Sequence, residues 1–280
     1  MQHNMKEKKK GSRIMIHIML DAYQCTDTKL NDMRAIYSTI SKATNILNVK
    51  TIMPPIVVPY YYGTEQSDDG ISAFVLLKEG HFTIHTFPER ECYFVDLLYN
   101  GFFNAEKLEN ILSKELPFKS RITNNIDRRF SIEDQQQKNV SIDERKDFGP
   151  HYLIRNKNEI TLDIGKVYKY LDYLPPAVNM TPIMRPIVIT DNVKSPEIIS
   201  GMTMIAQSHI ALHYNIESKS FFADIFSCSF IDCNDITAYV ENGLGVKCEN
   251  VLISRGSKHA NRLPTRDEFI ARYSKWRENI

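Results

Sequence analysis

This chain of 280 residues lacks the features that are typical of nucleic-acid-binding, membrane and secreted proteins. Its formal net charge is only +1, which predicts no strong attraction to nucleic acid or to an anionic membrane surface. No apolar run approaches the length of a membrane span, and no apolar stretch suited to a secretory signal follows the basic start of the sequence. We therefore expect a cytoplasmic protein whose partners include neither nucleic acid nor a membrane.

Cysteine is also scarce and unpatterned. The five cysteines are an odd number and contain no paired Cys-x-x-Cys motif. This favours free thiols in a reducing compartment over a disulfide framework or a zinc site. His-x-x-x-His occurs at His81 and at His209, but in strand-like segments and without the glutamate of a His-Glu-x-x-His zinc motif. We therefore expect no metal.

The sequence does contain an internal duplication. Residues 71–85 (ISAFVLLKEGHFTIH) recur 128 residues later as residues 199–213 (ISGMTMIAQSHIALH). A further match joins residues 48–58 to residues 179–189 at an offset of 131. The pairs that correspond at the offset of 128 are Ser72 and Ser200, His81 and His209, His85 and His213, Glu89 and Glu217, Phe94 and Phe222, and Asp96 and Asp224. The chain therefore consists of two copies of one domain.

Two corresponding positions differ in a way that matters for chemistry. Gly80 of the first copy stands where the second copy has Ser208, and Asn100 stands where it has Cys228. A hydroxyl or a thiol can act as a nucleophile or an acid, whereas glycine and asparagine offer neither group. Only the second copy is therefore expected to carry a nucleophile.

The spacing of apolar residues predicts the same order of elements in each copy. We place a basic tail at 1–12, the first copy at 13–127, a charged linker at 128–147, the second copy at 148–260 and a C-terminal helix at 261–280. The helices expected within the copies cover residues 29–47, 105–116, 163–174 and 234–244. Short loops between consecutive strands favour an antiparallel sheet. The predicted fold class is α+β: two tandem α/β sandwich units, each an antiparallel sheet with helices on one face, packed as a pseudo-dimer.

The segment from Ser208 to His213 is predicted to be a strand. Alternate side chains of a strand share a face, so that Ser208 is expected on the face opposite His209 and His213. A serine–histidine pair within this strand is therefore not expected. For His81 and His209 we favour a structural role, as partly buried histidines whose hydrogen bonds are satisfied.

These motifs resemble those of a known family. The segment AQSHIALH…FFADIFSC (206–228) is similar to the pyruvoyl-forming segment of the S-adenosylmethionine decarboxylases. In that family Glu-Ser-His-(Ile/Leu)-(Ser/Thr)-Ile-His-Thr is followed by Asp-(Ile/Leu)-Phe-(Thr/Ser)-Cys. The first copy matches the same template in KEGHFTIHTFPE…YFVDLLYN (78–100), so that the resemblance covers nearly the whole chain, once in each copy.

The resemblance implies a protein that makes its own cofactor. The hydroxyl of Ser208 would attack the preceding carbonyl, cleavage would fall between Gln207 and Ser208, and Ser208 would become a pyruvoyl group. In the family this group forms a Schiff base with the amine of the substrate and acts as the electron sink for decarboxylation. Cys228 would be the acid that returns a proton to the substrate carbon.

The resemblance also implies one composite active site in each chain. The first copy would supply Ser72 and His85, which assist processing, and Glu89, which binds the ribose of the substrate. The second copy would supply Ser208 and Cys228. The related site in the first copy would be inactive.

Some substrate-binding positions depart from the family or are less specific. Gln207 replaces the usual glutamate, which removes a negative charge near a cationic substrate. Tyr61, within a run of three tyrosines, and Phe148 stand near the positions where the family stacks an aromatic ring on adenine.

Three readings follow from these residues. The first is a decarboxylase of S-adenosylmethionine that supplies polyamine synthesis. The second is the same chemistry on another small amino acid, ornithine or arginine. The third is a catalytically silent paralogue that regulates an active enzyme. Beyond the internal pseudo-dimer, further homo-oligomers are possible.

Overall fold

The computed structural model describes residues 15–25, 27–63, 66–128, 147–206 and 208–257. The predicted basic tail, Gln207, the C-terminal helix at 261–280 and nearly all of the linker lie outside these ranges. No helix of the described residues is long and apolar enough to cross a membrane.

The described residues form two antiparallel six-stranded sheets with the same topology. The strand order is β2-β3-β4-β5-β1-β6 in the first sheet and, read in the same direction, β8-β9-β10-β11-β7-β12 in the second. The first sheet contains β1 (Met15–Tyr23), β2 (Ile56–Tyr60), β3 (Gly70–Leu77), β4 (Gly80–Phe87), β5 (Cys92–Asn100) and β6 (Ser120–Asp127). The second contains β7 (Gly149–Asn156), β8 (Ile187–Thr190), β9 (Ile198–Ile205), β10 (Ser208–Asn215), β11 (Ser220–Phe226) and β12 (Cys248–Arg255).

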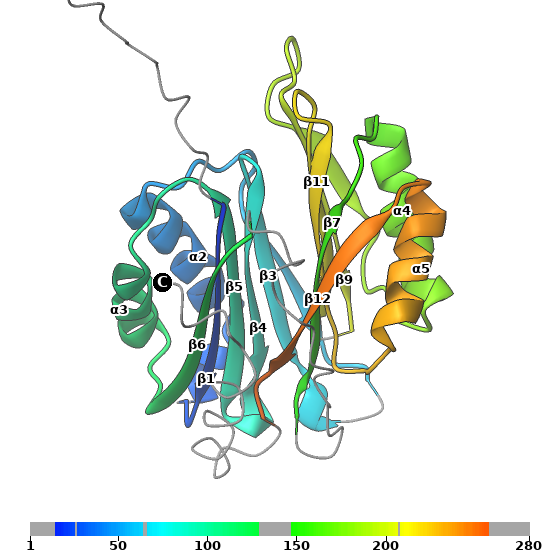
Figure 1. Cartoon of the computed structure of the whole chain (residues 1–280). Helices are drawn as coiled ribbons and strands as arrows, with labels where there is room; N and C mark the ends of the chain where they lie inside the picture. Colours follow the sequence, from blue (N-terminus) through cyan, green and yellow to red (C-terminus); the bar gives the residue numbers. More distant parts are fainter. Residues whose placement is uncertain (1–14, 26, 64–65, 129–146, 207, 258–280) are drawn as a thin grey trace, which may run out of the picture.

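Helices cover the outer face of each sheet, and the two sheets face each other (Figure 1). The helices of the first copy are α1 (Asp27–Leu30), α2 (Met33–Leu47) and α3 (Ala105–Glu115), with the short turns η1 (Gln66–Asp68) and η2 (Pro88–Arg90). Those of the second copy are α4 (Ile164–Ala177) and α5 (Cys233–Leu244). The predicted fold class is confirmed.

Two details of the predicted elements are wrong. The single helix expected at 29–47 is two helices, because the side chain of Asp32 accepts hydrogen bonds from the backbone N–H groups of Arg34 and Ala35 and so starts α2. Strands β2, β6 and β12 were not predicted. Strand β6 carries polar residues such as Asn124 and Asn125 and lies at a sheet edge, so that its hydrophobic signal is weak.

Each sheet is buried on both faces. Along β1, Ile18 and Leu20 belong to the hydrophobic core beneath the helices, whereas His17 and Asp21 point to the opposite sheet. Between the sheets, apolar clusters include one around Phe74 and Met202 and another formed by seven residues: Tyr23, Phe87, Cys92, Phe94, Ile122, Phe148 and Phe226. We call this second group the aromatic cluster. The centre between the sheets is polar.

Candidate active site

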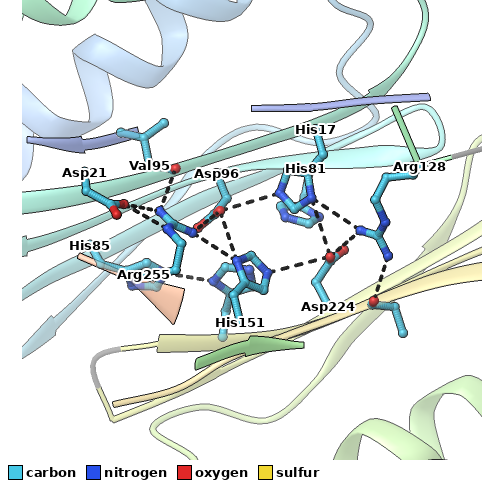
Figure 2. Close-up of polar contacts among 12 residues, drawn as sticks. His17, Asp21, His81, His85, Val95, Asp96, Arg128, His151, Asp224 and Arg255 are labelled. Atoms are coloured by element: carbon cyan, nitrogen blue, oxygen red, sulfur yellow. Dashed lines mark hydrogen bonds and ion pairs between the residues drawn. The ribbon is translucent and has the colours of Figure 1, made fainter. Parts of the chain in front are cut away.

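A layer of histidines and aspartates fills the centre between the two sheets (Figure 2). Its members lie on β1, β4 and β5 of the first sheet and on β7, β10 and β11 of the second, and each is 0% exposed. They are His17, Asp21, His81, His85, Asp96, His151, His209, His213 and Asp224. Ionised groups are costly to bury without partners, so that the layer needs compensating charge.

Two arginines, one from each copy, supply that charge. Arg255 of β12 donates hydrogen bonds to Asp96 at 2.7 Å and to Asp21 at 2.9 Å. Arg128, directly after β6, donates to Asp224. Each arginine thus pairs with an aspartate of the other copy (Figure 2). Arg128 was expected at the start of a charged linker, but it is only 5% exposed.

The arginines decide the ionisation of the layer. Burial is the largest single influence and raises the pKa of Asp96, but the Arg255 guanidinium, His151 and His17 together hold that pKa well below its usual value. Burial likewise raises the pKa of Asp224 most, but Arg128 together with His151 and His17 holds it well below its usual value. For Asp21, burial dominates and leaves the pKa raised, although Arg255 partly offsets it.

Hydrogen bonds join serine and histidine side chains in two series that cross between the sheets. In the first series, Ser72 Oγ lies 2.8 Å from His85 Nδ1, and His85 Nε2 lies 2.9 Å from His209 Nδ1. In the second series, Ser200 Oγ lies 2.9 Å from His213 Nδ1, and His213 Nε2 lies 2.8 Å from His81 Nδ1. The two series are related by the duplication, and each joins a serine–histidine pair of one copy to a histidine of the other.

The histidines of both series are neutral near pH 7. Burial lowers the pKa of His209 to about 3 and that of His213 to about 4, and it holds the pKa values of His81 and His85 well below the usual range. The prediction that His81 and His209 are partly buried is wrong, and the prediction that they are satisfied holds only for their Nδ1 atoms, which are hydrogen-bonded. Both are 0% exposed, and the Nε2 atom of each has no hydrogen-bond partner among the described residues.

Ser208 begins β10, one residue before His209. Alternation along this strand places it on the face of Ile210 and Leu212, beneath the helices, while His209 points to the opposite sheet. Ser208 is 0% exposed, and its Oγ has no hydrogen-bond partner among the described residues. A buried hydroxyl without a partner is costly in an ordinary strand serine, which makes Ser208 an unusual residue at this position.

Cys228, two residues beyond β11, is half-buried and packs against the aromatic cluster. Phe148 belongs to this cluster and is 2% exposed. Burial, with Tyr62 and further neighbours that include Cys228, raises the pKa of Tyr60. Tyr60 therefore lies within electrostatic reach of the thiol.

Two other predicted substrate-binding residues lie at the surface. Glu89 is exposed in η2, directly after β4. Tyr61 is 46% exposed, and its hydroxyl donates a hydrogen bond to the side chain of Asn31. The structure thus groups Ser72 and His85 with the start of β10, but it does not bring Tyr61 to them.

In the first copy, the region around Gly80 and Asn100 corresponds to that around Ser208 and Cys228, but it contains other contacts. Glu79 accepts hydrogen bonds from the side chains of Asn100 and Asn215 beside a cavity of about 210 Å³. At Gly80, an added Cβ atom would lie 2.0 Å from the backbone oxygen of Leu98. The backbone of β5 therefore leaves no room for a serine at position 80.

Sequence reasoning gave no role to the central residues His17, His151, Arg128 and Arg255. The repetition of Asp96 as Asp224 was a usable signal. His17 and His151, however, are 134 residues apart and so do not correspond at the offset of 128. His17, Asp96 and His151 offer atoms within 4.8 Å of one another, a spacing that could hold a metal ion. However, Arg255 already donates to Asp96 and, at 3.0 Å, to His151 Nδ1, which disfavours a second cation there.

Comparisons with known proteins point to one family. The family model of S-adenosylmethionine decarboxylase matches residues 16–129 and 153–256. The S-adenosylmethionine decarboxylase proenzyme of Pyrobaculum islandicum is 31% identical over 113 residues, which are 39% of this chain and 86% of that protein. A crystal structure of the adenosylmethionine decarboxylase from Aquifex aeolicus is similar over 46% of this chain and 99% of its own, with 19% identity and a TM-score of 0.37. An unknown protein from Galdieria sulphuraria matches over 88% of this chain and 100% of its own, with 8% identity and a TM-score of 0.22.

Proposed function

Because the chain belongs to the S-adenosylmethionine decarboxylase family, we propose that it is a self-processing, pyruvoyl-dependent decarboxylase that is cleaved between Gln207 and Ser208. Its substrate is S-adenosylmethionine, and its product donates aminopropyl groups to polyamine synthesis. The observation that carries the proposal is the first series, Ser72–His85–His209, which reaches from one copy to the residue beside Ser208 in the other.

Processing uses groups of the chain itself. Ser208 Oγ attacks the carbonyl carbon of Gln207, and the peptide bond becomes an ester with a free amine. Removal of the Cα proton of Ser208 then expels the carboxylate of Gln207, and hydrolysis of the remaining dehydroalanine releases ammonia and leaves the pyruvoyl group. His85 is suited to accept a proton because burial keeps it neutral, and its hydrogen bond to Ser72 fixes the orientation of its ring.

The residues around position 208 then bind the substrate and move protons. The pyruvoyl group supplies the electron sink that decarboxylation needs. Cys228, at the border of the aromatic cluster, donates the proton that the substrate carbon takes up. Glu89 binds the ribose hydroxyls, and Phe148 with a tyrosine of the 60–62 run contributes aromatic surface for adenine.

The direct test is the intact mass of freshly purified protein under denaturing conditions. We expect two fragments, 1–207 and 208–280, the second lighter by one ammonia than a peptide that begins with serine. The Ser208→Ala variant should remain a single chain. A single chain in the wild-type protein would refute self-processing and would favour the silent regulatory paralogue.

The duplication offers a matched control for the role of His85. His85 and His213 occupy corresponding positions and make corresponding hydrogen bonds. We expect His85→Ala to slow cleavage by about a hundredfold or more, with the ester accumulating. His213→Ala removes an equally buried imidazole from the second series and should leave cleavage at position 208 intact. Equal rates in the two variants would contradict the composite site.

The substrate is identified by release of labelled carbon dioxide from the processed protein. S-adenosylmethionine, ornithine and arginine, each carrying a labelled carboxyl group, should be compared at equal concentrations. We expect turnover of S-adenosylmethionine alone. Turnover of ornithine or arginine instead would refute the assigned substrate while leaving self-processing in place.

A further inference from the structure

The first series ends at a residue that has no assigned part in the reaction. His209 is buried, it comes from the second copy, and its Nδ1 atom faces the Nε2 atom of His85. The two rings are nearly parallel, with an interplanar angle of 4° and centroids 5.1 Å apart. The hydrogen bond therefore joins the edges of two nearly coplanar, neutral imidazoles.

The protonation of the two rings is coupled. A neutral imidazole carries one N–H, so that His85 can donate at only one of its two nitrogens. If His85 Nε2–H donates to His209, then His85 Nδ1 presents a lone pair to Ser72 and accepts from its hydroxyl. If His209 Nδ1–H donates instead, His85 must donate to Ser72 and has no free base at Nδ1.

The polar layer selects the first of these arrangements. When His209 Nδ1 accepts, its proton is on Nε2, the nitrogen that has no partner among the described residues. The ionised carboxylates of Asp96 and Asp224 are the acidic groups that act on His209, and each has an oxygen without a hydrogen-bond partner among these residues. In the electrostatic field of these carboxylates, a protonated Nε2 is more stable than a lone pair at that atom.

We propose that His209 is a positioning residue that sets the tautomer of His85 and thereby holds its Nδ1 atom as the proton acceptor facing Ser72. The inference rests on the proposed self-processing for its kinetic consequence, but the tautomer itself can be measured without cleavage. His81 has the corresponding place in the second series, opposite His213, where the preceding residue, Gly80, has no hydroxyl.

The kinetic experiment compares three variants by the rate of appearance of fragment 208–280. His209→Phe keeps a ring but removes the acceptor, and we expect cleavage about ten- to a hundredfold slower. His209→Asn retains an acceptor near the position of Nδ1, and it should stay within about threefold of wild type. His81→Phe makes the same change in the second series and should cleave at the wild-type rate. Far-UV circular dichroism establishes that each variant is folded.

Three kinetic results would overturn the inference. A wild-type rate for His209→Phe would mean that the acceptor is not needed. Equal slowing of His209→Phe and His209→Asn would show that ring packing, not hydrogen bonding, matters. Equal slowing of His81→Phe would indicate general damage to the polar layer.

The tautomer is read in the uncleaved Ser208→Ala protein by the nitrogen chemical shifts of His85. We expect a protonated Nε2 and a bare Nδ1, and a mixture of tautomers once His209→Phe is added. A proton on Nδ1 would refute the inference even if processing occurs. If the wild-type chain is never cleaved, the proposed function fails, and this measurement still decides the role of His209.

Discussion

Replacing Arg255 by methionine should destabilise the protein strongly. The side chain is 0% exposed and bonds to the carboxylates of Asp21 and Asp96 and to His151. Methionine keeps an unbranched apolar side chain but removes the charge, all of these hydrogen bonds and the contact of the guanidinium with the Phe226 ring. Because two buried carboxylates then lose their partner, we expect a loss of about 3–5 kcal/mol in the free energy of unfolding at pH 7.

Urea unfolding at equilibrium, followed by circular dichroism, measures this loss. The matched control is Arg185→Met, because Arg185 pairs with Asp172 at 2.8 Å but its side chain is 82% exposed, so that solvent screens the pair and its loss should change stability little. In Arg255→Met the unpaired aspartates have raised pKa values in the folded state, so that they take up protons there as the pH falls below 7. The loss in the free energy of unfolding relative to wild type should therefore shrink as the pH falls. A deficit at pH 7 no larger than that of the control would refute the assignment of Arg255 as the partner of these carboxylates.

The remaining predictions concern pH and the two copies. Burial lowers the pKa values of His209 and His213 to about 3 and about 4, against 6.5 for a free histidine, so that only the unfolded state binds these protons at mildly acid pH. The stabilising effect of the neutral histidines should therefore be fully present above pH 6.5, and the free energy of unfolding should fall between pH 6.5 and 4 by roughly 1 kcal/mol per pH unit for each histidine. Urea midpoints measure this fall. A constant midpoint would contradict the burial of these histidines as neutral groups. Gly80→Ser should create no second cleavage site by mass spectrometry and should destabilise the fold by about 1–3 kcal/mol, because its Cβ would meet the oxygen of Leu98 at 2.0 Å. Cys228→Ala should cleave like wild type but lose decarboxylation by about a hundredfold, and loss of both would contradict a role confined to the substrate.

The elements that sequence reasoning found are those with a strong local signal. Strands β3, β4, β9 and β10 are buried along their whole length, which gives nearly continuous apolar runs, and the duplication shows them twice. The break at Asp32 was missed because the helical spacing of apolar residues continues across it and hides the signal of the N-cap. Edge strands such as β6 were missed because their polar residues fit a loop equally well.

The sequence by itself determined the duplication, the fold class and the position of the lone serine–cysteine pair, because these depend only on residue order and spacing. The tertiary structure decided which side chains meet. Strand pairing places Ser72 opposite His85 within one sheet, but the bond from His85 to His209 joins residues 124 positions apart and exists only where two sheets close on each other. Arg128 likewise looked like the start of a charged linker. Its partner, Asp224, needs a cation only after the opposite sheet has excluded water from it, and no local pattern in the sequence records that event.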